Sequence, residues 1–330
     1  MVRRIAAVGA LLVLTACSTP ITPTSPAQPP SADTTDCGGP TAVTVDDADE
    51  LTEALAGVRP GAVIALAPGR FAGTFAATTS GSADRPITLC GPRDAVLDGG
   101  AIDGDYTLHL DGVSHYRLLG FTVSGGQKGV MVDAGQRNLL DGLLVQGTGD
   151  EGVHLRRASS DNVVRGLTVR DTGQRNAKFG EGIYVGSAES NWCELTACGP
   201  DRSDRNTIEA NSISGTTSES VDIKEGTTGG ALRDNTFDGA GMTAADAWVN
   251  VKGNGWTITG NTGTDSPEDG FQVFEILDGW GLDNTFTANT ATVNADGWAF
   301  NISRNEERNA VSCDNVARAA GKGLTRDACR

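Results

Sequence analysis

Short apolar segments recur along most of the chain, each followed by a turn of Gly, Ala, Asp or Asn and then by a second short apolar segment. The anchor residues of these segments are Leu118, Leu140, Val164, Ile208, Leu232, Ile258 and Phe286. Successive anchors lie 22, 24, 44, 24, 26 and 28 residues apart. Such a period is typical of a solenoid whose coils stack strand on strand, and it predicts an all-β, single-stranded right-handed parallel β-helix.

The step of 44 residues is nearly two units. We expect the strand GIYVGSA from Gly182 to supply the missing strand, and a long excursion from Ser190 to Asp204 to leave the solenoid here. Leucine-rich repeats have a similar period, but their leucine pattern is absent from this sequence.

A second strand aligns in each coil, in segments such as GVHL from Gly152, SVDI from Ser220 and WVNV from Trp248. Side chains alternate across a strand, so the apolar residues point inward and the residues between them point outward. Because stacked coils lie about 4.8 Å apart, the outward residues form columns. The first column is Met131, His154, Tyr184, Asp222, Asn250 and Gln272; the second is Asp133, Arg156, Gly186, Lys224, Lys252 and Phe274; the third is Lys128, Glu151, Glu181, Glu219, Ala247 and Asp269.

Two further patterns support the solenoid. Residues 47–58 carry Leu51, Leu55 and Val58 on one helical face, with acids early, so they predict a short N-terminal helix that caps the first coil. Asparagines fall at the same point of successive units, at Asn211, Asn235, Asn261 and Asn289. We interpret them as a ladder of side chains that hydrogen-bond along the axis, not as catalytic residues.

The first residues predict export. A basic start and an apolar run are followed by LTAC, which resembles the lipobox of bacterial lipoproteins and implies lipid on Cys17. The alternative is an ordinary signal peptide with an incidental cysteine. The sequence thus divides into a signal and lipobox at 1–17, a Pro/Ser/Thr-rich tether at 18–36, and one β-helix domain at 37–330. We expect a cell-membrane lipoprotein that faces outside the cytoplasm and touches the membrane only through its anchor.

Six cysteines remain, and an even number in an exported chain predicts disulfides. Six cysteines allow fifteen pairings. Cys193 with Cys198 would close a local loop, Cys313 with Cys329 would pin the C-terminal tail, and Cys37 with Cys90 would fasten the start. The alternative is a metal site, but the paired C-x-x-C spacing that zinc favours is absent.

Composition and charge narrow the partners. The sequence has 44 glycines and only 5% aromatic residues, which favours many short strands and tight turns. A formal net charge of −16 argues against nucleic acid, and disfavours any polyanion unless a local basic patch or a bound cation reverses the field. We expect a monomer.

The outward columns gather groups that can do chemistry. Lys224 and Lys252 would be neighbours on adjacent strands, and each would lower the pKa of the other unless Glu219 or Asp222 offsets it. A lysine of lowered pKa can abstract a proton. Glu181, Glu219 and Asp222 offer oxygen ligands suited to calcium. The alternative is an ordinary solvated β face, on which charged residues are common.

The segments GAVIALAPGRFAG, SADRPITLCG and AVLDGG resemble the opening coils of pectate-lyase-like β-helix proteins, especially polysaccharide lyase family six, which includes chondroitinase B and alginate lyases. That family has a Glu five residues before a catalytic Lys, matched here by Glu219 and Lys224. Lys252 stands where the family has an Arg, and Glu181 lies one coil back. The resemblance implies that calcium neutralises a uronate carboxylate, that Lys224 takes the adjacent proton, and that the glycosidic bond breaks by β-elimination.

The sequence departs from that pattern at two positions. Thr217 replaces a further Glu, and Lys252 cannot hold a carboxylate in the bidentate fork of an Arg. The related mannuronan epimerases use the same proton abstraction, but GFQVFE from Gly270 lacks the Asp and His expected of them.

We therefore expect a protein that binds an extended, acidic polysaccharide along one sheet and cleaves it as a lyase. Lys224 would be the base, Lys252 would steady the carboxylate, and Tyr184 would give a proton to the leaving oxygen, with His154 as an alternative base or acid. The remaining groove residues would be Arg156, Asn250, Asp269 and Gln272. One alternative is a glycoside hydrolase that pairs Asp222 with Glu219 or Asp269. The other is a non-catalytic carbohydrate-binding or structural β-helix.

Overall fold

The computed structural model describes residues 37–38 and 42–330. The predicted export signal, the lipidation site Cys17 and the tether at 18–36 lie outside these residues and stay predictions. Within the described part of the chain, no helix is long and apolar enough to cross a membrane.

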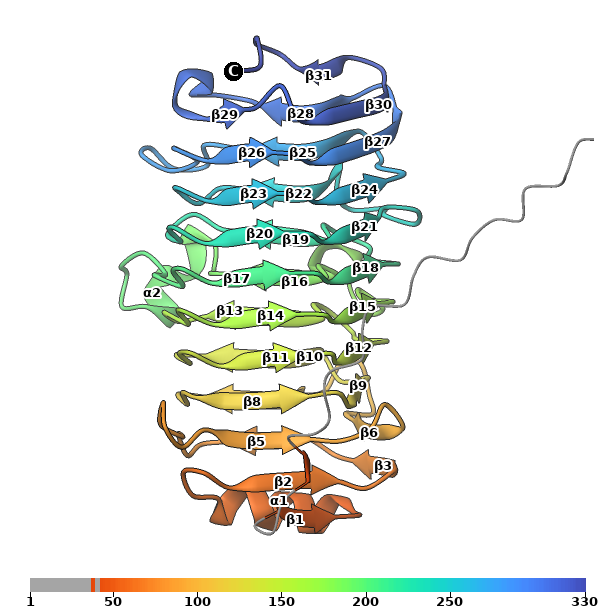
Figure 1. The fold of residues 1–330 in the computed structure, drawn as a ribbon, viewed down its shortest axis with the longest axis vertical. Helices are drawn as coiled ribbons and strands as arrows, with labels where there is room; N and C mark the ends of the chain where they lie inside the picture. The colour runs from red at the N-terminus through yellow and green to blue at the C-terminus, as the bar shows by residue number, and fades with distance from the viewer. Residues whose placement is uncertain (1–36, 39–41) are drawn as a thin grey trace, which may run out of the picture.

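Three parallel sheets run along the axis of one solenoid, and each coil after β1 contributes one strand to each sheet (Figure 1). An eleven-stranded sheet holds β1 (Ala42–Val45), β2 (Val63–Leu66), β5 (Ile87–Cys90), β8 (Tyr116–Leu119), β11 (Leu139–Asp141), β14 (Val163–Arg165), β17 (Thr207–Glu209), β20 (Ala231–Arg233), β23 (Thr257–Thr259), β26 (Thr285–Thr287) and β29 (Ala310–Val311). The predicted right-handed parallel β-helix is confirmed.

The other two sheets have ten strands each. The site sheet, as we call it, holds β4 (Phe75–Ala77), β7 (Tyr106–Asp111), β10 (Lys128–Asp133), β13 (Val153–Arg156), β16 (Ile183–Val185), β19 (Val221–Ile223), β22 (Ala247–Val251), β25 (Asp269–Val273), β28 (Trp298–Ile302) and β31 (Gly323–Thr325). The third sheet holds β3 (Gly69–Ala72), β6 (Ala95–Asp98), β9 (Thr122–Ser124), β12 (Leu144–Gln146), β15 (Thr168–Arg170), β18 (Ser212–Ser214), β21 (Thr236–Asp238), β24 (Thr262–Thr264), β27 (Thr290–Ala295) and β30 (Val316–Ala320).

Helical segments are few and short. The predicted cap is α1 (Ala48–Gly57), which begins after Asp47, whose side chain accepts from the Glu50 N–H. Leu51 and Leu55 are buried against the first coil, so the predicted capping helix is confirmed. The other helical segments are η2 (Ala177–Phe179), η3 (Glu189–Asn191), α2 (Trp192–Leu195) and η4 (Glu306–Arg308).

The 44-residue step is one coil, not two. Val164 pairs directly with Ile208, so β14 and β17 are neighbours in the eleven-stranded sheet. The strand from Gly182 that was expected between them belongs to the site sheet, where Ile183 pairs with Val153. The additional residues of this coil form two loops that project from the solenoid. One is the turn before β16 and the other is the excursion after it. The sequence period was misread because two insertions together have the length of one repeat.

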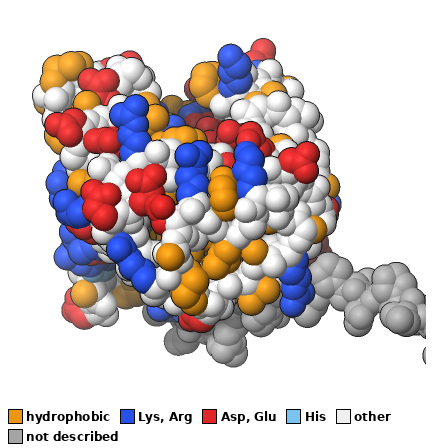
Figure 2. Space-filling view, turned by 90° about the horizontal axis from the view of Figure 1, so that it is seen from above, with side chains coloured by type: hydrophobic (Ala, Val, Ile, Leu, Met, Phe, Trp, Pro, Cys, Tyr) orange, Lys and Arg blue, Asp and Glu red, His pale blue; other side chains and the backbone are white. Residues whose placement is uncertain are grey.

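The inward and outward faces of the site sheet are confirmed by register and burial. The column Met131, His154, Tyr184, Asp222, Asn250 and Gln272 pairs in sequence. Along each strand, apolar residues alternate with the members of this column. They point into the core and are fully buried, as are Val221 and Phe271. The outward column is also buried, which a bare solvated face would not be. Viewed along the axis, the molecule is hollowed between two projecting lobes, with acidic and basic side chains gathered there (Figure 2).

The predicted asparagine ladder is confirmed. Asn235 Oδ1 accepts from the backbone N–H of Asn211 and from its side-chain amide, at 3.0 and 2.9 Å. Asn235 in turn donates to Asn261 Oδ1, and the ladder continues through Asn289 to Asn315. These asparagine side chains are buried. Each of them hydrogen-bonds with backbone groups at a turn, where no neighbouring strand can pair with those groups.

We expect Asn235→Ala to lower the free energy of unfolding by roughly 2–4 kcal/mol, because it leaves the buried Asn211 N–H without its acceptor and removes a side-chain donor to the Ile208 carbonyl. Urea unfolding followed by circular dichroism measures this loss. Thr262→Ala is the matched control, since that side chain is exposed beside the ladder. An equal loss in both variants would contradict a stabilising ladder.

All three expected disulfides are present. Cys37 pairs with Cys90, Cys193 with Cys198, and Cys313 with Cys329. The second closes the excursion after β16, and the third fastens the last coil. No metal is therefore needed to explain these cysteines.

Candidate active site

The centre of the outward surface is a buried carboxylate that pairs with two lysines. Asp222 Oδ1 accepts from the Lys252 ammonium at 2.6 Å, and its Oδ2 lies 2.7 Å from the Lys224 ammonium. Lys224 follows β19 and Lys252 follows β22, so adjacent coils bring both side chains to one carboxylate. Asp222 is 1% exposed and Lys252 is 6% exposed, which makes the triad largely desolvated.

Burial and charge compete in setting the pKa values of this triad. Burial by itself would raise the pKa of Asp222, but the two lysines outweigh it and hold this pKa below its usual range. Burial would lower the pKa of Lys224, yet the charge of Asp222 and the proximity of Tyr184 raise it above its usual value. Asp222 thus keeps the neighbouring Lys252 from lowering the pKa of Lys224, which is the exception that the sequence analysis allows.

Tyr184 lies beside the triad on β16. Its ring centroid is 5.1 Å from the Lys224 ammonium, and its ring packs edge-on against His154 at 4.3 Å between centroids. Burial is the main reason that the pKa of Tyr184 is raised well above its usual value. The phenol is therefore neutral and can give a proton.

Glu181 and Glu219 complete the central cluster. Each offers an oxygen that lies within 4.8 Å of the other and of Asp222. Burial, together with the carboxylates of Glu151, Asp222 and Glu219, raises the pKa of Glu181 well above its usual range. Glu219 accepts from Ser218 at 2.5 Å and from Asn250 at 3.3 Å.

These three carboxylates fit calcium poorly. Both oxygens of Asp222 already pair with ammonium groups, so a calcium ion would have to displace a lysine or lie against two positive charges. Glu181 Oε2 is buried and has no hydrogen-bond partner among the residues that the structure describes. Calcium binding by Glu181, Glu219 and Asp222 stays a prediction, and no chemical step below passes through it.

His154 is held by its neighbours rather than open to solvent. Its Nε2 lies 2.9 Å from the Gly186 carbonyl, and its Nδ1 lies 3.3 Å from Glu151 Oε1 and 3.5 Å from the Lys128 ammonium. Burial lowers the pKa of His154, although Glu151 opposes this. Burial would raise the pKa of Glu151, but His154 and Lys128 bring it down to about 2. Both ring nitrogens thus face protein groups in this arrangement.

Arg156 lies on β13, further toward the N-terminal end of the site sheet. Its Nε donates to Asp133 Oδ1 at 2.7 Å, and one terminal nitrogen donates to Asp133 Oδ2 and to the Tyr106 hydroxyl at 3.2 Å each. His109 Nε2 also lies 3.0 Å from Asp133. Asp133 is buried, so this network fixes the guanidinium in one orientation.

On the C-terminal side of the lysines the column continues with amides. Asn250 and Gln272 are buried neighbours in register. The side-chain oxygens Asn250 Oδ1 and Gln272 Oε1 have no hydrogen-bond partner in the described structure. Asp269 accepts from Gln272 and Asn301 and from the backbone of Trp298, so it is fully engaged. The expected groove residues therefore lie along one sheet, and their roles stay predictions.

A pocket of about 220 Å³ adjoins the triad, and the sequence predicted only its floor, formed by His154, Arg156, Glu181 and Tyr184. Its walls were missed. One wall carries Arg175 and Phe179 from the loop before β16, and the other includes Asn191 and Leu195 from the excursion after it. Both loops interrupt the repeat, and this interruption was the signal that could have identified them.

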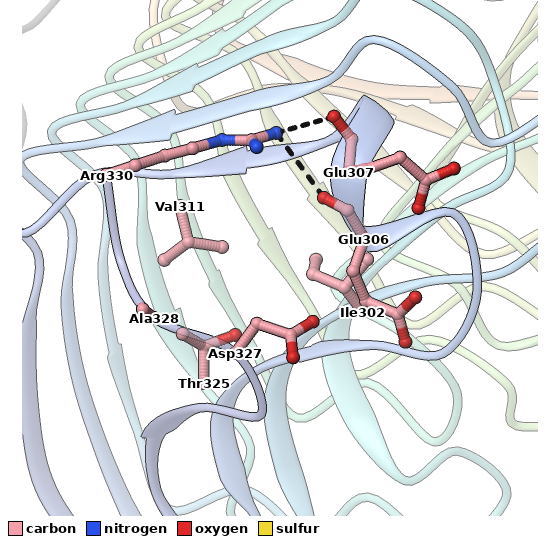
Figure 3. Close-up of a pocket in the computed structure, with 8 residues that line it drawn as sticks. All are labelled: Ile302, Glu306, Glu307, Val311, Thr325, Asp327, Ala328 and Arg330. Carbon is pink, nitrogen blue, oxygen red and sulfur yellow. Dashed lines mark hydrogen bonds between the residues drawn. The ribbon is translucent and has the colours of Figure 1, made fainter.

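A larger pocket, of about 400 Å³, lies at the C-terminal end of the solenoid, on the coils of β28 and β31, whereas Lys252 follows β22. It is lined by Ile302, Glu306, Glu307, Val311, Thr325, Asp327, Ala328 and Arg330 (Figure 3). The Arg330 guanidinium donates to the carbonyls of Glu306, Glu307 and Asn309, so it closes the last coil. None of the predicted site residues lines this pocket.

Comparison with solved structures identifies a relative that matches almost the whole chain. No protein-family model matches the chain, and no curated protein sequence matches it. The crystal structure of alginate lyase from Paenibacillus sp. str. FPU-7 matches with a TM-score of 0.80 and 34% identity, covering 87% of this chain and 98% of that one.

Two more distant structures share the fold alone. Pectate lyase Pel9A matches with a TM-score of 0.53 and 16% identity over 83% of this chain and 75% of its own. The Family 28 exopolygalacturonase of Yersinia enterocolitica matches with a TM-score of 0.50 and 10% identity over 88% and 76%. The resemblance to pectate-lyase-like β-helix proteins is thus confirmed, and at 34% identity over nearly its whole length the chain belongs to the polysaccharide lyase family of the Paenibacillus alginate lyase.

Proposed function

We propose that this chain is an exported, lipid-anchored lyase that cleaves an alginate-type uronate polysaccharide by β-elimination. The observation that carries the proposal is the meeting of Lys224 and Lys252 at one buried carboxylate, Asp222, with the Tyr184 ring beside the Lys224 ammonium. The name of the Paenibacillus relative supports alginate as the first polymer to test. The export signal and Cys17 support a site of action outside the cytoplasm.

The reaction needs a base, an acid and neutralisation of the uronate carboxylate. Lys252, whose side chain donates to Asp222, would steady that carboxylate and so acidify the proton on the adjacent carbon. Lys224 would remove this proton. The electron pair then forms the carbon–carbon double bond as the bond to the glycosidic oxygen breaks, and Tyr184 would give its proton to that oxygen.

Lys224 is protonated in the resting enzyme because Asp222 raises its pKa. It becomes a base only after it loses that proton, so the competent fraction of the enzyme increases with pH. We therefore expect kcat/KM to rise from neutral toward alkaline pH. His154 is less suited to be the base, because it is buried and both of its ring nitrogens face protein groups.

The geometry favours a lyase over a glycoside hydrolase. A hydrolase needs two carboxyl groups about 5–5.5 Å apart if retaining and about 6.5–9.5 Å apart if inverting. The close approach of Asp222 and Glu219 oxygens, within 4.8 Å, leaves no room for an inverting arrangement, and the pairing of Asp222 with two lysines makes it a poor acid or nucleophile for a retaining one. Asp269 is hydrogen-bonded by three groups and has no free role as an acid.

The test is to incubate the purified chain with alginate and a panel of other uronate polymers, and to follow the ultraviolet absorbance of the unsaturated product. We expect absorbance to rise with alginate, and to rise equally in the presence of a calcium chelator because the lysines already neutralise Asp222. No absorbance change on any polymer would refute the lyase proposal. Loss of the signal on chelation, with recovery on added calcium, would instead support calcium at the three carboxylates.

A further inference from the structure

The pocket beside the lysines is enclosed by three parts of the chain. Residues of β10, β13 and β16 form its floor, and further lining residues come from the loop that contains η2 and from the excursion that contains η3 and α2. The Cys193–Cys198 disulfide closes that excursion. Tyr184 belongs both to this pocket and to the surroundings of Lys224, so the pocket continues directly from the proposed catalytic centre.

The floor of the pocket has unused hydrogen-bonding capacity. Glu151 Oε2 and Glu181 Oε2 are buried, line the pocket and have no hydrogen-bond partner in the described part of the chain. Each residue is only 5% exposed. A buried polar atom without a partner costs free energy, so these oxygens favour a ligand that brings hydroxyl groups.

The charged side chains around the pocket are already paired. Lys128 donates to Glu151 at 2.7 Å, Arg175 pairs with Asp150, and Arg156 pairs with Asp133. The pocket therefore offers no unpaired cation to an isolated anion. It is better suited to the hydroxyl-bearing face of a sugar ring than to the carboxylate of that sugar, which would have to point away from the paired cations.

The wall carries an exposed aromatic ring. Phe179 is 48% exposed although it is a large apolar residue, and it lines the pocket from η2. The turn that presents it is held in place, since Asn176 caps the Lys178 N–H and Thr217 donates to the Ala177 carbonyl. An aromatic face beside a few convergent polar groups is a common design of ligand pockets.

We propose that this pocket is a subsite for one sugar residue of the polymer. It lies on the N-terminal side of the triad of Asp222, Lys224 and Lys252. The ring of that sugar packs on Phe179, and its hydroxyl groups hydrogen-bond with the free oxygens of Glu151 and Glu181. The assignment rests on the proposed function, because it takes the ligand to be a polysaccharide. It also gives Phe179 a role that the sequence pattern did not suggest.

The test compares Phe179→Ala with the wild type on alginate oligosaccharides of increasing length. We expect KM to rise roughly two- to tenfold for oligosaccharides long enough to fill the pocket, with kcat and the KM of the shortest cleaved substrate unchanged. Phe179→Trp should restore KM. Val316→Ala, which removes another exposed apolar side chain on β30, should leave all values unchanged.

A binding experiment separates this inference from the proposed activity. Titration calorimetry of the same oligosaccharides into Lys224→Ala, with and without Phe179→Ala, measures affinity without turnover. A two- to tenfold loss of affinity in the double variant supports the subsite even if no polymer is cleaved. Equal affinities, or a loss that does not depend on oligosaccharide length, would overturn it. Thermal unfolding of each variant confirms that the chain is folded.

Discussion

Lys224→Ala is expected to lower kcat/KM on the cleaved uronate polymer by about 10²–10⁴-fold, the usual contribution of a general base. The structure supports this position because the Lys224 ammonium lies between Asp222 and the ring of Tyr184. The measurement is the initial rate of absorbance increase, at several pH values, on the polymer that the wild type degrades.

Two further variants separate a base from a fixed charge. Lys224→Arg keeps the positive charge but cannot lose its proton, so it should be as inactive as the alanine variant. Lys322→Ala removes a lysine that pairs with Glu268 on the exposed surface, and should keep full activity. Appreciable activity in Lys224→Arg would show that Lys224 acts only as a cation, and would move the search for the base to Tyr184 or His154.

Asp222→Asn is expected to destabilise the fold by roughly 3–5 kcal/mol, because it leaves two ammonium groups together with no carboxylate between them. The neutral amide also removes the charge that raises the pKa of Lys224. The rise of kcat/KM with pH should therefore move to lower pH in this variant. Urea unfolding measures the first effect and a pH–rate profile measures the second.

The stability effect has a defined pH window in the wild type. The pKa of Asp222 is lowered in the folded state, so its contribution is present at neutral pH and is lost as pH falls below the usual carboxyl range. The pKa of Lys224 is raised, so its contribution is lost only as pH rises above the usual lysine range. Asp222→Asn should remove both contributions at neutral pH. A variant of unchanged stability and unchanged pH profile would contradict the triad.

Residues that repeat were predictable because their environment repeats. The apolar positions at Val221 and Ile223 recur at the coil period, and strand alternation then fixes which neighbours face outward. The same logic predicted that Asp222 lies next to Tyr184 and Asn250 in register. Six cysteines allow fifteen pairings, and the three disulfides that form are those that the sequence analysis named.

Contacts made by non-repeating segments were not predictable in this way. The sequence placed Lys224 and Lys252 as neighbours, but the distance of each ammonium from Asp222 depends on side-chain direction and burial. The 44-residue step was misread because two loops together have the length of a coil. Those loops supply Phe179 and Leu195 to the pocket, and no periodicity constrains their paths.

The sequence by itself determined the β-helix, its core and the face that carries the polar columns. The reason is that only one register of the stacked strands places the apolar residues of every coil in the core. Only the tertiary structure decided that Asp222 is shared by two lysines and that two insertions form the walls of a pocket beside them. The physical reason is that backbone pairing is set by local alternation, whereas the pairing of charged side chains and the course of loops depend on contacts between groups far apart in the chain.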